Sequence, residues 1–221
     1  MRFTWEKKMF CVVTPTIPGR ARLLRAAIRS VKAQTFKDYV HVVCGDGDNP
    51  EGEAVTREEG ATWTSIPKAG GWGHGCRNHV VANWDANYFM FLDDDNVYKP
   101  ECMEEVAKAA ADNVLKLGRI GILPPFLAIQ IDWIARWLKP PQRWVIPGEP
   151  KVEKGYYDQM CSVIRSDIAK KVRFKNTYEQ DFEFATECLA LAGNMILVRK
   201  VLGVYSWSWE EDHAKDEGAA G

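Results

Sequence analysis

Short apolar runs alternate with stretches of helical periodicity along the first half of the chain, and this alternation constrains the fold more than any other feature. The runs that favour buried strands are Phe10–Val13, Tyr39–Cys44, Thr62–Ile66, Tyr88–Leu92 and Arg119–Leu123. The main helical stretches between them are Arg20–Gln34, Cys76–Ala86 and Pro100–Leu117. Strand, helix and strand in this order predict a parallel sheet with right-handed crossovers, and therefore an α/β fold.

The second half of the chain is less regular. It predicts a strand at Tyr156–Arg165, a helix at Glu179–Ala192 and a strand at Asn194–Val198. The segment Phe126–Leu138 is too apolar to be a solvated face. It could cover the sheet, contact another subunit or touch a membrane surface, and the sequence leaves these three alternatives open. The acidic end of the chain, 210–221, is expected to be frayed.

Composition fits one globular domain and excludes several classes of partner. The 221 residues are 46% hydrophobic and 27% charged, which is enough apolar material for a sizeable core. Lys and Arg number 29 against 30 Asp and Glu, so nucleic acid is not an expected partner. No apolar run reaches the roughly 18 residues of a membrane helix, and the first ten residues do not resemble a signal peptide. We expect a cytoplasmic protein whose six cysteines are reduced, with membrane association possible only through 126–138.

Three adjacent carboxylates, Asp93, Asp94 and Asp95, follow the apolar run that ends at Leu92. Ligands of parallel sheets bind beyond the carboxyl ends of the strands, so Thr14 and Asp46, which follow two other runs, are expected to converge with them. Adjacent carboxylates repel one another, and a divalent cation or a row of hydrogen-bond donors would offset that repulsion. Oxygen ligands favour magnesium or manganese, completed by phosphate and water. The alternative is an acidic loop that caps the next helix.

Several segments, taken in order, resemble the family 2 glycosyltransferases. The residues that carry the resemblance are Cys11–Thr16, Ser30–Phe36, Val42–Gly47, Arg77–Asn78 and Phe91–Asp95. It covers about 10–105 and thins in the second half to Asp158–Val163 and Glu179–Asp181. The resemblance implies a single GT-A domain over 1–221, with a mostly parallel twisted sheet and helices on both faces. It also implies a nucleotide-sugar-binding half at about 10–105 and an acceptor-binding half at about 106–205.

The activity that the resemblance implies is transfer of a sugar, with inversion, from a nucleotide diphosphate to the hydroxyl of a glycan or another acceptor. A UDP-sugar is the expected donor, and manganese or magnesium the expected cofactor. Carried over residue by residue, Thr14, Thr16 and Asp46 would contact the nucleoside. Asp93 and Asp94 would contact the ribose or the sugar, with support from Arg77. Asp95 would bind the metal, and Asp181 would be the general base.

Two positions depart from the family pattern. Gln180 stands before the expected base where the family usually has Glu, and the histidine that often completes the metal site has no counterpart closer than His213. Two rival functions therefore stay open, a nucleotide-sugar-binding module without catalysis and a nucleotidyltransferase that acts on a sugar phosphate. Against the second, residues 14–20 are a poor version of the glycine-rich, basic phosphate turn that it needs.

Glycines and tryptophans give weaker signals. The glycine cluster 70–75 resembles a flexible segment that lines the donor site, and its His74 is expected to be a surface residue. Aromatic faces suit the apolar C–H faces of sugar rings and also lipid carriers at a membrane surface. The tryptophans of the second half are therefore candidates for the acceptor site: Trp133, Trp137, Trp144, Trp207 and Trp209.

Overall fold

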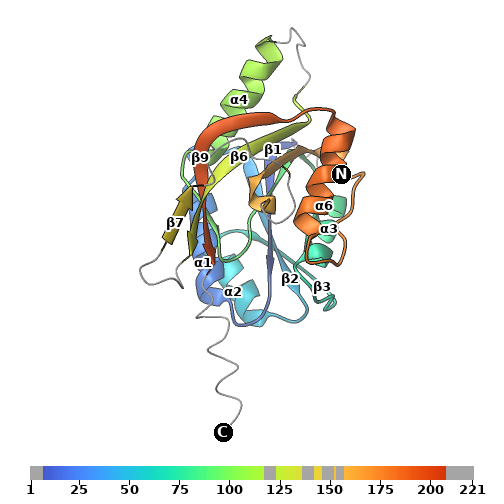
Figure 1. The fold of residues 1–221 in the computed structure, drawn as a ribbon. Helices are drawn as coiled ribbons and strands as arrows, with labels where there is room; N and C mark the ends of the chain where they lie inside the picture. Colours follow the sequence, from blue (N-terminus) through green and yellow to red (C-terminus); the bar gives the residue numbers. More distant parts are fainter. Residues whose placement is uncertain (1–6, 117–122, 136–141, 146–151, 153–156, 208–221) are drawn as a thin grey trace, which may run out of the picture.

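A computed structural model describes residues 7–116, 123–135, 142–145, 152 and 157–207 (Figure 1). Its first half is a run of parallel strands joined by helices, as the alternation of apolar runs predicts. The elements are β1 (Lys8–Thr16), α1 (Ala21–Lys32), β2 (Tyr39–Asp46), α2 (Pro50–Glu59), β3 (Thr62–Ile66), α3 (His74–Asn83) and β4 (Ala86–Phe91). β1 pairs in parallel with both β2 and β4, and β2 pairs in parallel with β3.

Local sequence explains where these elements begin and end. The buried face of α1 consists of Leu24, Ala27, Ile28 and Val31, which recur at helical spacing. Helix α2 begins where the Asn49 side chain accepts a hydrogen bond from the Gly52 amide, with Pro50 in the first turn. It ends at Gly60, whose φ of 82° is the left-handed conformation that glycine adopts most easily.

The second half adds strands of both directions to the same sheet. Its elements are β5 (Val97–Tyr98), α4 (Cys102–Lys116), β6 (Phe126–Ala135), β7 (Gln142–Val145), the 3-10 turn η1 (Gln159–Cys161), β8 (Ser162–Arg165), α5 (Ser166–Ala169), α6 (Gln180–Ala192) and β9 (Ile196–Trp207). Among the described residues the sheet order is β3-β2-β1-β4-β8-β6-β9-β5, with β7 paired to β6. β8 is antiparallel to β4 and β6, whereas β6 and β9 are parallel.

The apolar segment Phe126–Leu138 is an interior strand for most of its length. Its residues Phe126–Ala135 form β6, which lies between β8 and β9 in the sheet. The side chains of 126–129 and of Ile131 are buried, so they are not available to a membrane or to another subunit. Of the three alternatives that the sequence left open, this part of the segment therefore belongs to the core, and 136–138 lie outside the described residues.

Two buried clusters cover the two faces of the sheet. Along β1, Phe10 and Val12 belong to one cluster, and Cys11 and Val13 belong to the other, because successive side chains of a strand point to opposite faces. Helices α1 and α4 contribute to the first cluster, whereas α3, α5 and α6 contribute to the second. Figure 1 shows α1 and α3 on different sides of the strands. The expected fold class, α/β with helices on both faces, is confirmed.

Three sequence predictions differ from the structure or fall outside it. The predicted strand Tyr156–Arg165 is a strand only from Ser162, because the Asp158 side chain caps the 3-10 turn that precedes it. The strand expected at Asn194–Val198 continues to Trp207 along β6. Most of the strand expected at 119–123 lies outside the described residues, as does the whole of 210–221.

All six cysteines are free and buried, as expected of reduced thiols. No helix in the described part of the chain is both long and apolar enough to cross a membrane.

Candidate functional site

The three consecutive carboxylates lie shortly after β4, and two of them are held by Thr16, the last residue of β1, and by Arg20, which follows β1. Asp94 is buried and accepts hydrogen bonds from the Thr16 hydroxyl at 2.7 Å and from Arg20 Nη1 at 2.5 Å. The other nitrogen of the same guanidinium, Nη2, lies 3.5 Å from Asp95 Oδ2. Arg20 therefore offsets the mutual repulsion of Asp94 and Asp95. From the sequence alone, a cation or a row of donors was expected to offset it.

Arg77 joins the first carboxylate of this cluster to the residue expected to be the base. Its Nη2 lies 2.5 Å from Asp93 Oδ1, and its Nη1 lies 3.6 Å from Asp181 Oδ1. The guanidinium is only 2% exposed and lies over the ring of Phe174, 5.5 Å from the centroid. Burial alone would lower the pKa of Arg77, but Asp93 and Asp181 outweigh it and leave that pKa raised. Arg77 is thus a fixed positive charge between two elements far apart in sequence.

Burial makes most of these carboxyl groups more basic. It raises the pKa of Asp181 to about 6, where Arg77 acts to lower it and Asp93 to raise it. The pKa of Asp94 is raised to about 6 by burial against the opposing effect of Arg20. Burial, then Asp93 and Asp94, raise the pKa of Asp95 to about 7. A cluster of carboxyl groups with raised pKa values around a buried guanidinium, here that of Arg77, is typical of a functional site.

Asp158 is a fifth carboxyl group at the same place. Its Oδ1 accepts a hydrogen bond from the Met160 amide at 2.7 Å, and this bond begins η1. Burial first, and Asp181 second, raise its pKa well above the ordinary range. The neighbouring Asp181 Oδ1 is buried and has no hydrogen bond, and it lies 3.6 Å from Arg77 Nη1. Asp158 is thus held by the backbone of η1, and Asp181 lies beside the Arg77 guanidinium.

Two of the expected nucleoside contacts have hydrogen-bond partners outside this cluster. Thr14 is fully buried and hydrogen-bonds His41 Nε2 at 2.9 Å; burial lowers the pKa of His41 to about 3, so the imidazole is neutral. Asp46 ends β2 and accepts hydrogen bonds from the amides of Ala69 and Gly70, at 2.6 and 3.0 Å. Of the residues predicted from the sequence, the structure brings together Thr16 with Asp94, and Arg77 with Asp93 and Asp181. Thr14 and Asp46 have other partners.

The glycine cluster forms a loop that is tied to the carboxylate site. The backbone oxygen of Trp72 accepts hydrogen bonds from Arg77 Nη1 and from Gln180 Nε2, both at 2.7 Å. Gly73 has a φ of 82°, and a Cβ at this position would come within 2.9 Å of Pro15. The loop therefore lies close against the end of β1, where a larger residue would not fit.

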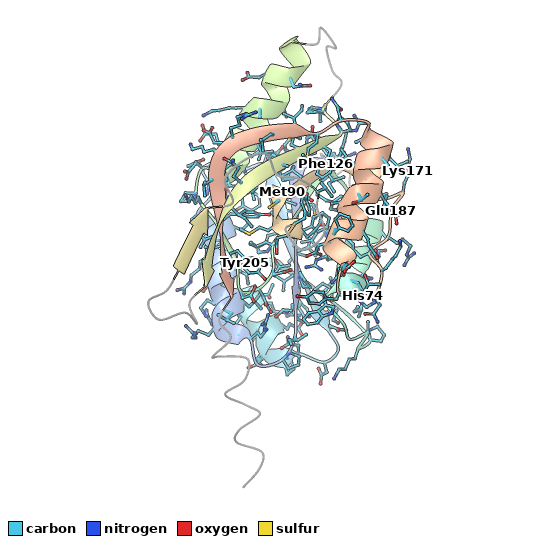
Figure 2. All side chains as sticks on the ribbon, in the orientation of Figure 1. His74, Met90, Phe126, Lys171, Glu187 and Tyr205 are labelled. Atoms are coloured by element: carbon cyan, nitrogen blue, oxygen red, sulfur yellow. The ribbon has the colours of Figure 1, made fainter. Side chains whose placement is uncertain are left out.

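Two residues of the site were missed from the sequence. Arg20 gave only the signal of a basic residue shortly after the first strand. Tyr205, near the end of β9, lies close enough to Asp158 and Asp93 for their charges to add to the burial that raises its pKa. Figure 2 shows Tyr205 and His74 in the lower part of the view, toward which β1 points in Figure 1. No periodicity marked Tyr205, because its place depends on the pairing of β9 with β6, which is a tertiary feature.

The carboxylates fit a divalent cation that is shared with a ligand. Within the described ranges, no group of three or more His, Cys, Asp and Glu side chains could hold a metal by itself. Asp95 remains partly exposed, at 18% of its side chain, and its contact to Arg20 is long at 3.5 Å. One or two carboxylates completed by phosphate and water is the usual arrangement for magnesium. His213, the other candidate ligand, lies outside the described residues.

Comparison with known proteins agrees with this geometry. The chain is 31% identical over 93 residues to an uncharacterized glycosyltransferase of Rickettsia prowazekii, covering 42% of this chain and 29% of that protein. It is 34% identical over 97 residues to the succinoglycan biosynthesis protein ExoW of Rhizobium meliloti, covering 41% and 30%. The chain thus spans about 30% of the length of these two relatives.

Solved structures share the fold at lower identity. TarS of S. aureus, residues 1–349 in complex with UDP, matches with a TM-score of 0.70 at 14% identity, over 93% of this chain and 62% of that one. The mannosyltransferase PcManGT of Pyrobaculum calidifontis, in complex with GDP-Man and Mn²⁺, matches with a TM-score of 0.66 at 13% identity, over 95% and 60%. The model of one family, glycosyl transferase family 2, matches residues 11–173, which is most of the chain. The chain therefore belongs to glycosyl transferase family 2.

Proposed function

We propose that this protein transfers a sugar from a nucleotide diphosphate donor to an acceptor hydroxyl, with inversion at the anomeric carbon. A UDP-sugar is the donor that we favour, and a divalent cation, manganese or magnesium, binds its diphosphate. The observation that carries the proposal is the buried Arg77, which holds Asp93 and Asp181 at one site from opposite halves of the chain. Such a site can bind a donor through one half and activate an acceptor through the other.

Asp181 is the general base in this proposal. Inversion requires the acceptor oxygen to attack the anomeric carbon from the face opposite the leaving group. As the new C–O bond forms, Asp181 takes the hydroxyl proton, and the bond to the diphosphate breaks with its electron pair on the phosphate oxygen. A pKa of about 6 suits this role, because the carboxylate is ionised at neutral pH and still basic enough to accept a proton.

Asp95, with Asp93 beside it, would hold the cation. Bound there, the cation would neutralise the charge that develops on the leaving diphosphate. The remaining carboxylate, Asp94, has both oxygens hydrogen-bonded, so we assign it and Thr16 to bracing the cluster. Arg77 keeps Asp93 and Asp181 apart and in place, and its own position is set by Trp72.

The nucleoside would lie beside Asp46, at the carboxyl ends of β1 and β2. Asp46 already fixes the loop at Ala69 and Gly70, and its remaining lone pairs would accept a hydrogen bond from the base. The Thr14 hydroxyl is already hydrogen-bonded to His41, so Thr14 would contribute by positioning the end of β1 beside the nucleoside. The nucleotide-binding part would then lie mainly within about 10–105, and the acceptor part mainly within about 106–205.

The test is calorimetric titration of the protein with UDP, GDP, TDP and CDP, each with manganese and again with EDTA. We expect UDP to bind only with the metal, and Asp95→Ala to lose this metal dependence. Binding of GDP instead of UDP would change the proposed donor to a GDP-sugar and would leave the proposed site residues unchanged. Failure of all four nucleotides to bind, with metal present, would overturn the proposed function.

A further inference from the structure

Trp72 and Tyr178 are the most exposed large apolar side chains in the described part of the chain, at 61% and 80%. Their rings meet edge to face, with centroids 5.5 Å apart and planes at 80°. An edge-to-face pair covers an edge of one ring and one face of the other, and it leaves at least one ring face open on each partner. Exposing two aromatic rings together costs hydrophobic free energy, so the pair calls for an explanation outside the core.

Both rings are anchored to the carboxylate site. Arg77 Nη1 donates to the Trp72 oxygen at 2.7 Å and lies 3.6 Å from Asp181 Oδ1, so the Trp72 backbone and this carboxylate share one buried nitrogen as a neighbour. Tyr178 stands in the turn closed by the Gln180 amide and the Thr177 oxygen, and this turn begins α6 three residues ahead of Asp181. The pair therefore stands at the rim of the site on the side of Asp181.

Gln180 holds this arrangement together. Its Nε2 donates to the Trp72 oxygen at 2.7 Å, and the side chain is buried. A glutamate at this position would have no proton to donate when ionised and would repel the carbonyl oxygen. The departure from the family pattern that counted against catalysis thus has a structural role, since it fixes the loop that carries Trp72.

We propose that Trp72 and Tyr178 bind a sugar ring of the acceptor by stacking, and that the acceptor is therefore a carbohydrate. This inference rests on the proposed function, because it takes Asp181 as the base. Aromatic faces fit the apolar C–H face of a pyranose, and the ring hydroxyls remain free at its edges. A sugar that stacks at this rim presents a hydroxyl toward Asp181.

The surroundings of the pair favour a sugar over a membrane surface. The neighbouring Asn176 and Thr177 are exposed and polar, and Lys175 is paired with Glu187 at 2.7 Å. Leu191, another exposed apolar residue, lies near the far end of α6, about 16 Å along the helix axis from its start. Two rings bordered by amide, hydroxyl and paired charges suit a ring that is apolar on its faces and polar at its edges.

The experiment is saturation-transfer NMR of the protein, with magnesium and UDP present, against the methyl glycosides of glucose, galactose, mannose, rhamnose, N-acetylglucosamine and N-acetylgalactosamine. We expect at least one glycoside to bind with transfer strongest at its ring C–H protons. Trp72→Ala and Tyr178→Ala should each weaken that binding about fivefold or more. Leu191→Ala, which removes a comparably exposed apolar side chain, is the matched control and should change nothing.

Gln180→Glu supplies a second arm that leaves both rings in place. We expect it to weaken the same glycoside by releasing the Trp72 loop, while calorimetry shows UDP binding within about twofold of the unchanged protein in every variant. Equal glycoside binding in all variants, or no glycoside binding while UDP still binds, would overturn the acceptor assignment alone. Loss of UDP binding in the Trp72 or Tyr178 variant would assign the pair to the donor and would also overturn the acceptor assignment. Failure of the unchanged protein to bind any of the four nucleotides would instead overturn the proposed function. Binding to phosphatidylglycerol vesicles that Trp72→Ala abolishes, without glycoside binding, would reassign the pair to a lipid surface.

Discussion

Asp181 combines burial with a free oxygen, and this determines how its charge responds to pH. Burial raises its pKa to about 6, against the lowering effect of Arg77. If the ionised form is the base, kcat/KM should rise with pH through about 6 and level off above it. The measurement is a pH profile of transfer at low substrate concentration. A rate that stays flat from about pH 5 to 7 would show that another group takes the proton.

Asp181→Asn should separate chemistry from binding. We expect kcat to fall by about 10² to 10⁴ while nucleotide affinity is retained, since the amide keeps the shape and loses the base. Asp85→Asn, at a carboxylate whose side chain is 74% exposed, is the control and should leave kcat unchanged. A variant at 181 with full activity would place the base elsewhere.

The same substitution should stabilise the protein. The folded-state pKa of Asp181 lies above its ordinary value of 3.8, so the stability linked to its protonated form is present at low pH and is lost as pH rises through about 6. At pH 7 the buried charge is a cost that asparagine avoids, by about 1 to 3 kcal/mol. Urea unfolding at pH 7 measures this difference. A less stable Asp181→Asn protein would mean that Arg77 compensates the charge in full.

For single residues, the sequence predicted the carboxylates and the support from Arg77, and it missed the contacts of Arg20 with Asp94 and Asp95. A strand followed by three aspartates is a local pattern, and Asp181 was identified from a short motif before a helix. Arg20 could not be assigned to Asp94 and Asp95 because that contact spans more than 70 residues of chain. Its signal, one arginine near the start of a helix, is the same signal that an exposed arginine gives.

The glycine loop shows what one element requires of its sequence. Gly73 and Gly60 both have φ near 82°, where a Cβ costs about 1 to 2 kcal/mol of strain. At Gly60 an added Cβ meets nothing within 4 Å, whereas at Gly73 it meets Pro15. We therefore expect Gly60→Ala to lower only stability, and Gly73→Ala to lower stability further and to weaken transfer as well. Thermal unfolding and an activity assay on the two variants check this, and equal effects on both measures would contradict it.

Elements of the first half were predictable because each shows a clear period. Phe126–Leu138 was not, because a continuous apolar run is compatible with a buried strand, a helix or a contact surface. Only the pairing with β8 and β9 identifies its first ten residues as a strand. The positions of the tryptophans expected at the acceptor site could not be predicted from the sequence for the same reason. Trp133 and Trp144 are register partners across β6 and β7, whereas Trp72, whose exposed ring is paired with that of Tyr178, belongs to the first half.

In the described part of the molecule the two halves of the chain share their core, because each of the two large buried clusters contains residues of both halves. Phe126 packs in the same cluster as Cys11 and Val13, and Leu127 packs with Phe10 and Val12. Phe126→Ala should therefore lower the free energy of unfolding by about 3 to 5 kcal/mol and leave one cooperative transition. Circular dichroism and tryptophan fluorescence, followed in one denaturant series, should coincide. Separate transitions would show that the halves fold independently.

Arg20 gives the carboxylate site an internal counter-ion, and this has a consequence for the order in which metal and nucleotide bind. A cation that arrives at Asp95 must compete with the guanidinium, and a diphosphate that arrives beside it would draw the guanidinium away from the carboxylates. Metal and nucleotide should then tighten each other's binding by the same factor, as reciprocity between coupled sites requires. Titrating magnesium with and without UDP, and UDP with and without magnesium, measures both factors. In Arg20→Ala, magnesium and UDP should bind more nearly independently of each other. One arginine would then determine whether metal and nucleotide bind cooperatively.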